Sequence, residues 1–147
     1  MKTEIPLTDP RRLAIVLAAT PRGAATCRRL ARRQLIAWGL DSTADEPYHS
    51  ALLIVAELAA NAVTHGRVAG RRFELGLALT GPVLRIEVSD CRGDRLPALP
   101  AVPCADSQSG RGLVLIDALA DRWGALPRHP GAKTVWAELD LPLPDAC

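Results

Sequence analysis

Aromatic side chains and long apolar runs are both scarce in this sequence. Only 3% of its 147 residues are aromatic, so a core must be packed mainly by Leu, Ala and Val. No stretch of about 18 apolar residues occurs, which argues against a transmembrane helix. The first residues, Met1–Pro6, lack the pattern of a signal peptide. We therefore expect a cytoplasmic protein that has no membrane partner.

Closely spaced metal-binding side chains are lacking too. The cysteines at positions 27, 91, 104 and 147 form no Cys-x-x-Cys pair, and the three histidines are dispersed. We interpret the cysteines as reduced thiols rather than as disulfides or zinc ligands.

The length and composition of the chain are those of one globular domain. The chain is 48% hydrophobic and 23% charged, and it contains no repeat. We expect one domain over residues 10–141, with an N-terminal tail at 1–9 and a C-terminal tail at 142–147.

Hydrophobic periodicity predicts alternating strands and helices. We expect strands at 11–18, 72–80, 83–90 and 133–141, and helices at 21–38, 47–65 and from Gly110 to near Gly124. Between the third strand and the last helix, residues 94–109 contain three prolines and fit neither period, which is typical of a functional or disordered loop. This order predicts a layered α/β sandwich.

The second expected helix carries a polar row on an otherwise apolar surface. Glu57, Asn61 and His65 follow one another at intervals of four residues, so they share a helix face. Buried polar groups are costly without a partner. The row is therefore either a half-exposed edge without chemistry or one side of a binding site.

Basic residues are concentrated toward the N-terminus. Residues 1–40 hold eight basic and two acidic side chains, a net charge of +6, and the remainder holds ten and fourteen, a net charge of −4. Within the first expected helix, Arg28 with Arg32 and Arg29 with Arg33 form two basic rows. Such rows suit an acidic protein partner or nucleic acid, although a merely solvated face explains them equally well.

The stretch Glu57-Leu58-x-x-Asn61-Ala62-x-x-His65-Gly66 resembles the N-box of the gyrase, histidine-kinase and MutL ATP-binding superfamily. Its ending is most similar to the small bacterial anti-sigma serine kinases and their actinobacterial relatives. The resemblance implies the Bergerat ATP-binding fold, a two-layer α/β sandwich in which helices cover one face of a mixed, mostly antiparallel sheet. It also implies that Glu57 acts as the catalytic base and that Asn61 ligates Mg²⁺. His65 ends the motif and is counted with the nucleotide-binding residues.

Asp90 ends an apolar strand at the place of the family's adenine-binding aspartate. The family continues with Asp-x-Gly-x-Gly, whereas this chain has Asp90-Cys91-Arg92-Gly93-Asp94. The first glycine, Gly93, is therefore displaced by one position, and the second is absent. An aspartate that merely caps a strand is the alternative interpretation.

Two further segments resemble family motifs. Gly110-Arg111-Gly112 is similar to the second glycine box, in which glycine lets the backbone approach phosphate and the helix start attracts it. Thr134 is similar to the threonine that bonds the adenine edge. A simple turn and an ordinary strand threonine are the alternatives, but the ordered set is more specific than any one part.

Taken together, the resemblance implies an anti-sigma-type regulator that binds ATP and Mg²⁺ and phosphorylates a Ser or Thr of a protein antagonist. It implies an anti-anti-sigma-type antagonist, a sigma factor and a homodimer as partners. The alternatives are a non-catalytic ATP-binding module that sequesters a partner, a detached histidine-kinase catalytic domain, and a DNA-binding protein supported by the arginines alone.

Overall fold

The computed structural model describes residues 11–40, 46–65, 70–90, 108–128 and 132–142. Three helices and five strands follow one another in the order β-α-α-β-β-α-β-β. They are β1 (Arg11–Ala18), α1 (Pro21–Ala37), α2 (Glu46–His65), β2 (Arg72–Thr80), β3 (Val83–Asp90), α3 (Gln108–Leu119), β4 (Arg122–Arg128) and β5 (Ala132–Asp140).

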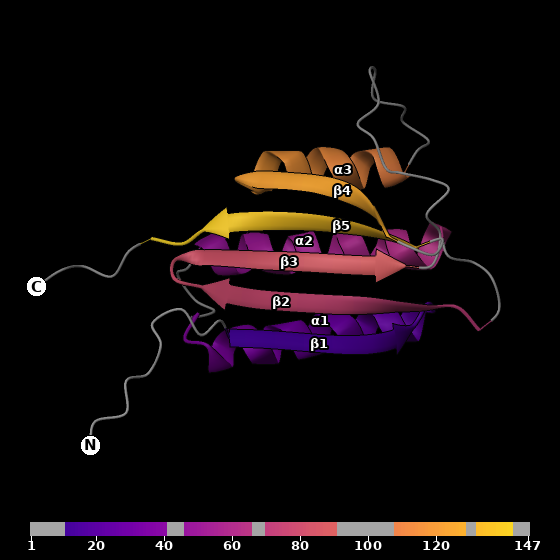
Figure 1. Cartoon of the computed structure of the whole chain (residues 1–147), viewed down its shortest axis with the longest axis horizontal. Coiled ribbons are helices and arrows are strands. Elements are labelled where there is room, and N and C mark those ends of the chain that lie inside the picture. The colour runs from indigo at the N-terminus through magenta and orange to yellow at the C-terminus, as the bar shows by residue number, and fades with distance from the viewer. Residues whose placement is uncertain (1–10, 41–45, 66–69, 91–107, 129–131, 143–147) are drawn as a thin grey trace, which may run out of the picture.

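All five strands join one sheet in the order β1-β2-β3-β5-β4, and every neighbouring pair is antiparallel. Figure 1 shows this sheet from its open side, with the helices behind it. The layered α/β class is thus confirmed. The mixed sheet anticipated from the family is antiparallel throughout within the described residues.

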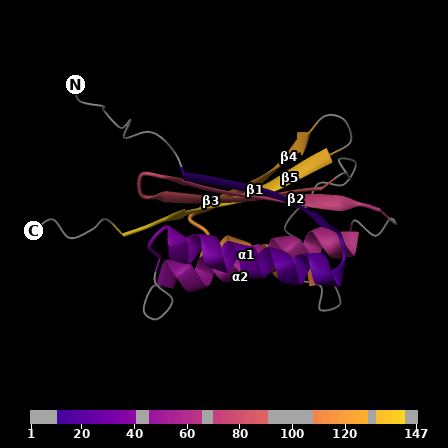
Figure 2. The same ribbon diagram turned by 90° about the horizontal axis from the view of Figure 1, so that it is seen from below.

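Helices cover only one face of the sheet, as Figure 2 shows for α1 and α2. On β3 the side chains of Leu84, Ile86 and Val88 are buried, and those between them are half-buried. On β5, Val135, Ala137 and Leu139 are buried in the same way. Because side chains alternate across a strand, these inward rows form the core together with the apolar sides of the helices.

Helix α1 begins where the sequence predicts. The hydroxyl of Thr20 accepts a hydrogen bond of 3.0 Å from the backbone N–H of Gly23, and Pro21 occupies the first turn. Cys27 lies on its buried face with no exposed surface, and burial raises the pKa of its thiol to about 11. This cysteine is therefore a neutral core residue at physiological pH.

Strand β4 was not anticipated, since the last helix was expected to reach Gly124 and instead ends at Leu119. Trp123 and Ala125 turn toward the core, and β4 lies at the edge of the sheet. Pro127 has no backbone N–H to donate to a neighbouring strand. An edge strand tolerates such a residue, because one of its sides has no neighbour. Gly124 is needed for close packing, because a Cβ there would lie 2.9 Å from Nε1 of Trp136.

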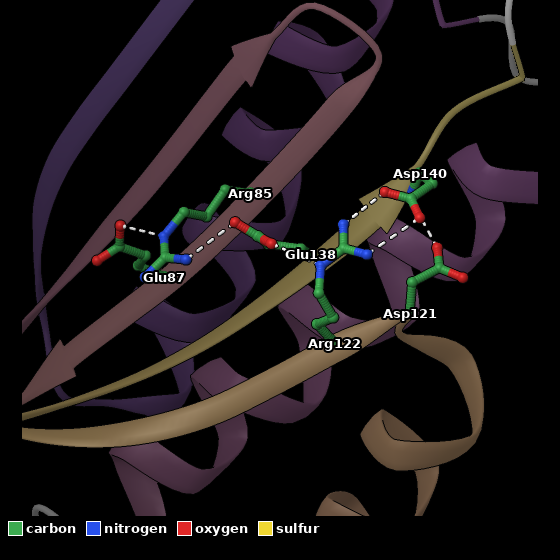
Figure 3. Close-up of polar contacts among 6 residues, drawn as sticks. All are labelled: Arg85, Glu87, Asp121, Arg122, Glu138 and Asp140. Carbon is green, nitrogen blue, oxygen red and sulfur yellow. Dashed lines mark hydrogen bonds and ion pairs between the residues drawn. The ribbon is translucent and has the colours of Figure 1, made fainter.

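Charged side chains link three strands across the open face of the sheet (Figure 3). Arg85 bonds both Glu87 and Glu138, and Arg122 bonds Glu138 and Asp140. The hydrogen bond from Arg122, aided by Arg85, holds the pKa of Glu138 below its usual value. The guanidinium of Arg85 also lies 4.4 Å from the ring centre of Trp136, a cation–π contact.

None of the helices in the described part of the chain is long and apolar enough to cross a membrane.

Candidate functional site

Four chain segments meet at one end of the sandwich. The last turns of α2, the end of β3, the first turns of α3 and the start of β5 all lie there, at the right of Figure 1. Antiparallel pairing of β3 with β5 fixes this geometry, because it sets Asp90 opposite Lys133. The residues predicted from separate motifs are thereby brought to the same end of the molecule.

Helix α2 presents the predicted polar row to this end. Glu57 and Asn61 are both half-buried, whereas Leu58, Ala59 and Ala62 beside them are buried in the core. The apolar side chains of α2 pack in the core and fix the position of the helix on the sheet. The backbone at Glu57 and Asn61 is thereby fixed as well. His65 is the last residue of α2, and its side chain lies outside the described part of the structure.

Gly112 lies where α3 closely approaches this polar row. A Cβ at this buried position would lie 2.9 Å from Oε2 of Glu57 and 3.5 Å from Oδ1 of Asn61. Real Cβ atoms essentially never come as close as 2.9 Å to another heavy atom. The absence of a side chain at Gly112 thus lets α3 lie directly against the carboxylate and the amide.

Helix α3 begins earlier than the glycine box suggested. It starts at Gln108, so Gly110, Arg111 and Gly112 belong to the helix rather than to a turn before it. The first four N–H groups of a helix lack intrahelical acceptors, and because α3 begins at Gln108 this set reaches Gly110 but not Arg111. The side chain of Arg111 is not among the described ones.

Asp90 is the last residue of β3 and continues the buried row of that strand, with 9% of its surface exposed. Its carboxylate faces the helix layer, which is the side of the sheet where Glu57 and Asn61 lie. Oδ2 of Asp90 is 3.9 Å from Nζ of Lys133, and the side chain of Lys133 is equally buried.

Thr134, which the resemblance expects to bond the adenine edge directly or through water, follows Lys133 in β5 and is buried, with 1% of its surface exposed. Its hydroxyl shares a hydrogen bond of 2.7 Å with the hydroxyl of Ser89, its partner across the β3–β5 ladder. Because neighbouring residues of a strand point to opposite faces, Thr134 and Ser89 are on the open side of the sheet and Asp90 and Lys133 on the helix side. The structure therefore does not bring the Thr134 side chain together with Asp90, and its adenine contact stays a prediction.

Lys133 is the residue of this site that sequence reasoning missed. The alternation that places Val135, Ala137 and Leu139 inward also places Lys133 inward, and this signal was available in the sequence. Gly93 and most of the proline-rich loop at 94–109 lie outside the described residues, and only its last two residues are seen, as the start of α3.

The assembled groups suit a ligand that carries both phosphate and a polar ring. An amide oxygen, a carboxylate and a helix start are hard donors and anion-binding groups of the kind that magnesium and phosphates prefer. No group of three His, Cys, Asp or Glu side chains that could hold a metal ion occurs within the described residues. A magnesium ion at Asn61 would consequently take most of its ligands from phosphate and water.

The fold and this site define a two-layer α/β protein with a polar binding end. The model of the histidine kinase-like ATPase domain matches residues 17–139. The chain therefore belongs to the histidine kinase-like ATPase domain family, and the resemblance inferred from its motifs is confirmed.

Among solved structures, the chain is similar to that of the RsbU and RsbW domains of Rv1364c from Mycobacterium tuberculosis. The match has a TM-score of 0.63 at 23% identity and covers 89% of this chain but 32% of that one. At this identity the similarity supports the fold alone. No curated protein is significantly similar in sequence.

The contact at Gly112 can be tested by a double-mutant cycle. Gly112→Ala in the Glu57→Ala background should stabilise the protein by about 1 kcal/mol, the usual gain for replacing a helical glycine. In the wild type the gain should be smaller by at least about 0.5 kcal/mol, because the new methyl group meets the carboxylate. Urea denaturation measures all four proteins.

The matched control is Ala118→Gly, an exposed position on the same helix. Its effect should be the same with and without Glu57. Equal gains from Gly112→Ala in both backgrounds would mean that the close approach of Gly112 to the Glu57 carboxylate does not constrain that side chain.

Proposed function

We propose that the chain binds ATP with Mg²⁺ and transfers the γ-phosphoryl group to a seryl or threonyl hydroxyl of a protein antagonist, thereby controlling a sigma factor. The observation that carries this proposal is the contact of Gly112 with Glu57 and Asn61 at the end of the sheet where Asp90 lies, in a chain of the histidine kinase-like ATPase domain family.

Each residue has a role that fits its surroundings. The carboxylate of Asp90 accepts a hydrogen bond from the exocyclic amine of adenine, which guanine lacks at that position. The amide oxygen of Asn61 holds the metal that neutralises the phosphates. The N–H groups at the start of α3, near Gly110 and Arg111, face the phosphate oxygens.

In this proposal Glu57 acts as the general base. Its carboxylate is one helical turn from Asn61, so a hydroxyl that enters beside the phosphates meets an acceptor for its proton. As the hydroxyl oxygen bonds to the γ-phosphorus, the bond from that phosphorus to the bridging oxygen breaks. ADP leaves and the proton passes to Glu57.

The partner surface in this proposal is the exposed side of α1. Arg28, Arg29, Arg32 and Arg33 are all exposed, and the opposite side of the helix is buried at Cys27, Ala31 and Leu35. A cationic stripe of this kind suits an acidic protein surface. A homodimer in a cytoplasmic setting, formed by the domain at 10–141, completes the proposal.

The adenine assignment predicts selective nucleotide binding. The protein should bind ATP with magnesium far better than GTP, and Asp90→Asn should weaken ATP binding by about 1–3 kcal/mol, because a hydrogen bond to a charged acceptor is lost. Calorimetry measures both affinities. Asp117→Asn, an exposed carboxylate of α3, is the control. Equal affinities for ATP and GTP would exclude Asp90 as the adenine-binding group.

The assigned roles of Glu57 and Asn61 predict different defects. Glu57→Gln should retain ATP binding and lose phosphoryl transfer by about 10²–10⁴-fold, the usual contribution of a positioned base. Asn61→Ala should weaken the magnesium-dependent part of ATP binding. Label transfer from γ-labelled ATP to an antagonist, alongside calorimetry, separates the two effects.

Glu87→Gln, on the open face of the sheet, is the control for both measurements. An antagonist phosphorylated at the wild-type rate by Glu57→Gln would show that another group takes the proton. Tight ATP binding without transfer to any protein would favour the alternative, a module that sequesters its partner without catalysis.

The stripe on α1 predicts salt-dependent partner association. Changing Arg28 and Arg32 to Glu should slow association with an acidic partner and leave ATP affinity unchanged, because surface charges mainly affect the association rate. Surface plasmon resonance at several salt concentrations measures this rate. The double change of Arg12 and Arg72 to Glu, on exposed positions of β1 and β2, alters the net charge equally and should have a smaller effect.

Unaltered association of the α1 variant would exclude this surface. Binding of duplex DNA that falls steeply with the logarithm of salt concentration would instead support a nucleic-acid role.

A further inference from the structure

A buried lysine beside the adenine-binding carboxylate calls for an explanation. Lysine is almost never fully buried without a partner, because removing its charge from water is costly. Lys133 is nevertheless buried at the start of β5, with 8% of its side chain exposed, among neighbours such as Val135 that belong to the core. A solvent-exposed lysine on the other side of the strand would avoid this cost.

The distance between Lys133 and Asp90 indicates how the pair is arranged. Nζ and Oδ2 are 3.9 Å apart, too far for a hydrogen bond and close enough for strong electrostatic attraction. Both side chains point to the helix side of the sheet, from residues directly opposite each other in the ladder. A negative acceptor and a positive donor are thus held side by side at the binding end.

This arrangement complements the edge of adenine. Next to its exocyclic amine, which donates, adenine has a ring nitrogen on either side that accepts. We propose that Lys133 is a specificity-determining residue of the nucleotide site, where its ammonium group donates a hydrogen bond to a ring nitrogen of adenine while Asp90 accepts one from the amine. This inference rests on the proposed ATP binding and extends it to a residue to which the resemblance assigned no role.

The same pair would also reject guanine. Guanine carries a carbonyl oxygen where adenine carries its amine, and this oxygen would face the carboxylate of Asp90. Where Lys133 donates to N1 of adenine, the N1–H of guanine would also direct a donor at the ammonium, and where Lys133 donates to N7, Asp90 alone discriminates. Like-to-like contacts of buried polar groups leave both sides unpaired, which is the effective way for a site to reject an analogue.

Nucleotide analogues test the proposal on the unaltered protein. Calorimetry would compare ATP with 1-deaza-ATP and 7-deaza-ATP, each of which lacks one ring nitrogen next to the amine, and with purine riboside triphosphate, which lacks the amine. We expect one of the two deaza analogues to bind about 10- to 100-fold more weakly than ATP, the loss of a hydrogen bond to a charged donor. Equal binding of ATP and both deaza analogues would overturn the proposal.

Lys133→Met removes the charge and keeps a similar length. In this variant the ratio between ATP and the weaker deaza analogue should fall close to one, while the ratio between ATP and purine riboside triphosphate persists through Asp90. Lys133→Arg should retain part of the difference in affinity between ATP and the weaker-binding deaza analogue. An unchanged deaza ratio in Lys133→Met would show that the lysine only supports the fold, because a structural role lowers all affinities alike.

Folding and function have separate controls. The double variant Lys133→Met with Asp90→Asn removes both buried charges and should fold if the single variant is destabilised because the buried carboxylate has lost the nearby ammonium. If the unaltered protein binds no ATP, the proposed function fails. If it binds ATP through Asp90 with the deaza ratio insensitive to Lys133, the function stands and this inference alone fails.

Discussion

The one-sided covering of the sheet is the constraint on which the rest of this structure depends. Because helices pack on a single face, the alternation of side chains along each strand sorts every residue into the core or onto the open side. The same rule continues past the core to the ends of the strands. It directs Asp90 and Lys133 to the helix side and Ser89 and Thr134 to the other, although the two pairs are adjacent in sequence.

The two faces of the sheet consequently handle charge in different ways. On the open face, Arg85, Arg122 and Glu138 bond one another with part of each side chain in water, so their charges are stabilised by hydration as well as by pairing. On the helix face, Lys133 and Asp90 have little contact with water and lie farther apart. A partly solvated network is an ordinary way to hold strands together, whereas a buried cation 3.9 Å from its carboxylate is consistent with the ligand contact proposed for Lys133.

Much of the fold could be predicted from the sequence, because its signals are local. Strands β2 and β3 have the predicted bounds, since strict alternation and the Gly81-Pro82 turn define them. Helix α1 begins at the predicted residue, Pro21. Strand β4 was missed because its seven residues include Gly124 and Pro127, and its strand character depends on pairing with β5, a contact that no local pattern records.

The candidate site was predictable in its parts and less so in its geometry. Motif spacing singled out Glu57, Asn61, Asp90 and Gly112, and all four lie at the same end of the sandwich. The motif also singled out Thr134, and the alternation of β5 adds its neighbour Lys133. A shift of one residue in a strand reverses the face that a side chain occupies, so Lys133 and Thr134 lie on opposite faces although both are buried.

Close packing at Gly112 gives the binding end its second constraint. The polar row of α2 could in principle face water, but α3 lies against it with no side chain between. The second turn of α3, at Gly112, therefore lies beside the carboxylate of Glu57 and the amide of Asn61. In the proposed transfer, the position of the Glu57 carboxylate matters more than a shifted pKa, because a general base must first lie within hydrogen-bonding distance of the hydroxyl. The glycine thus does for α2 and α3 what the ladder does for β3 and β5: it lets the backbone of one element lie directly beside the polar side chains of its neighbour.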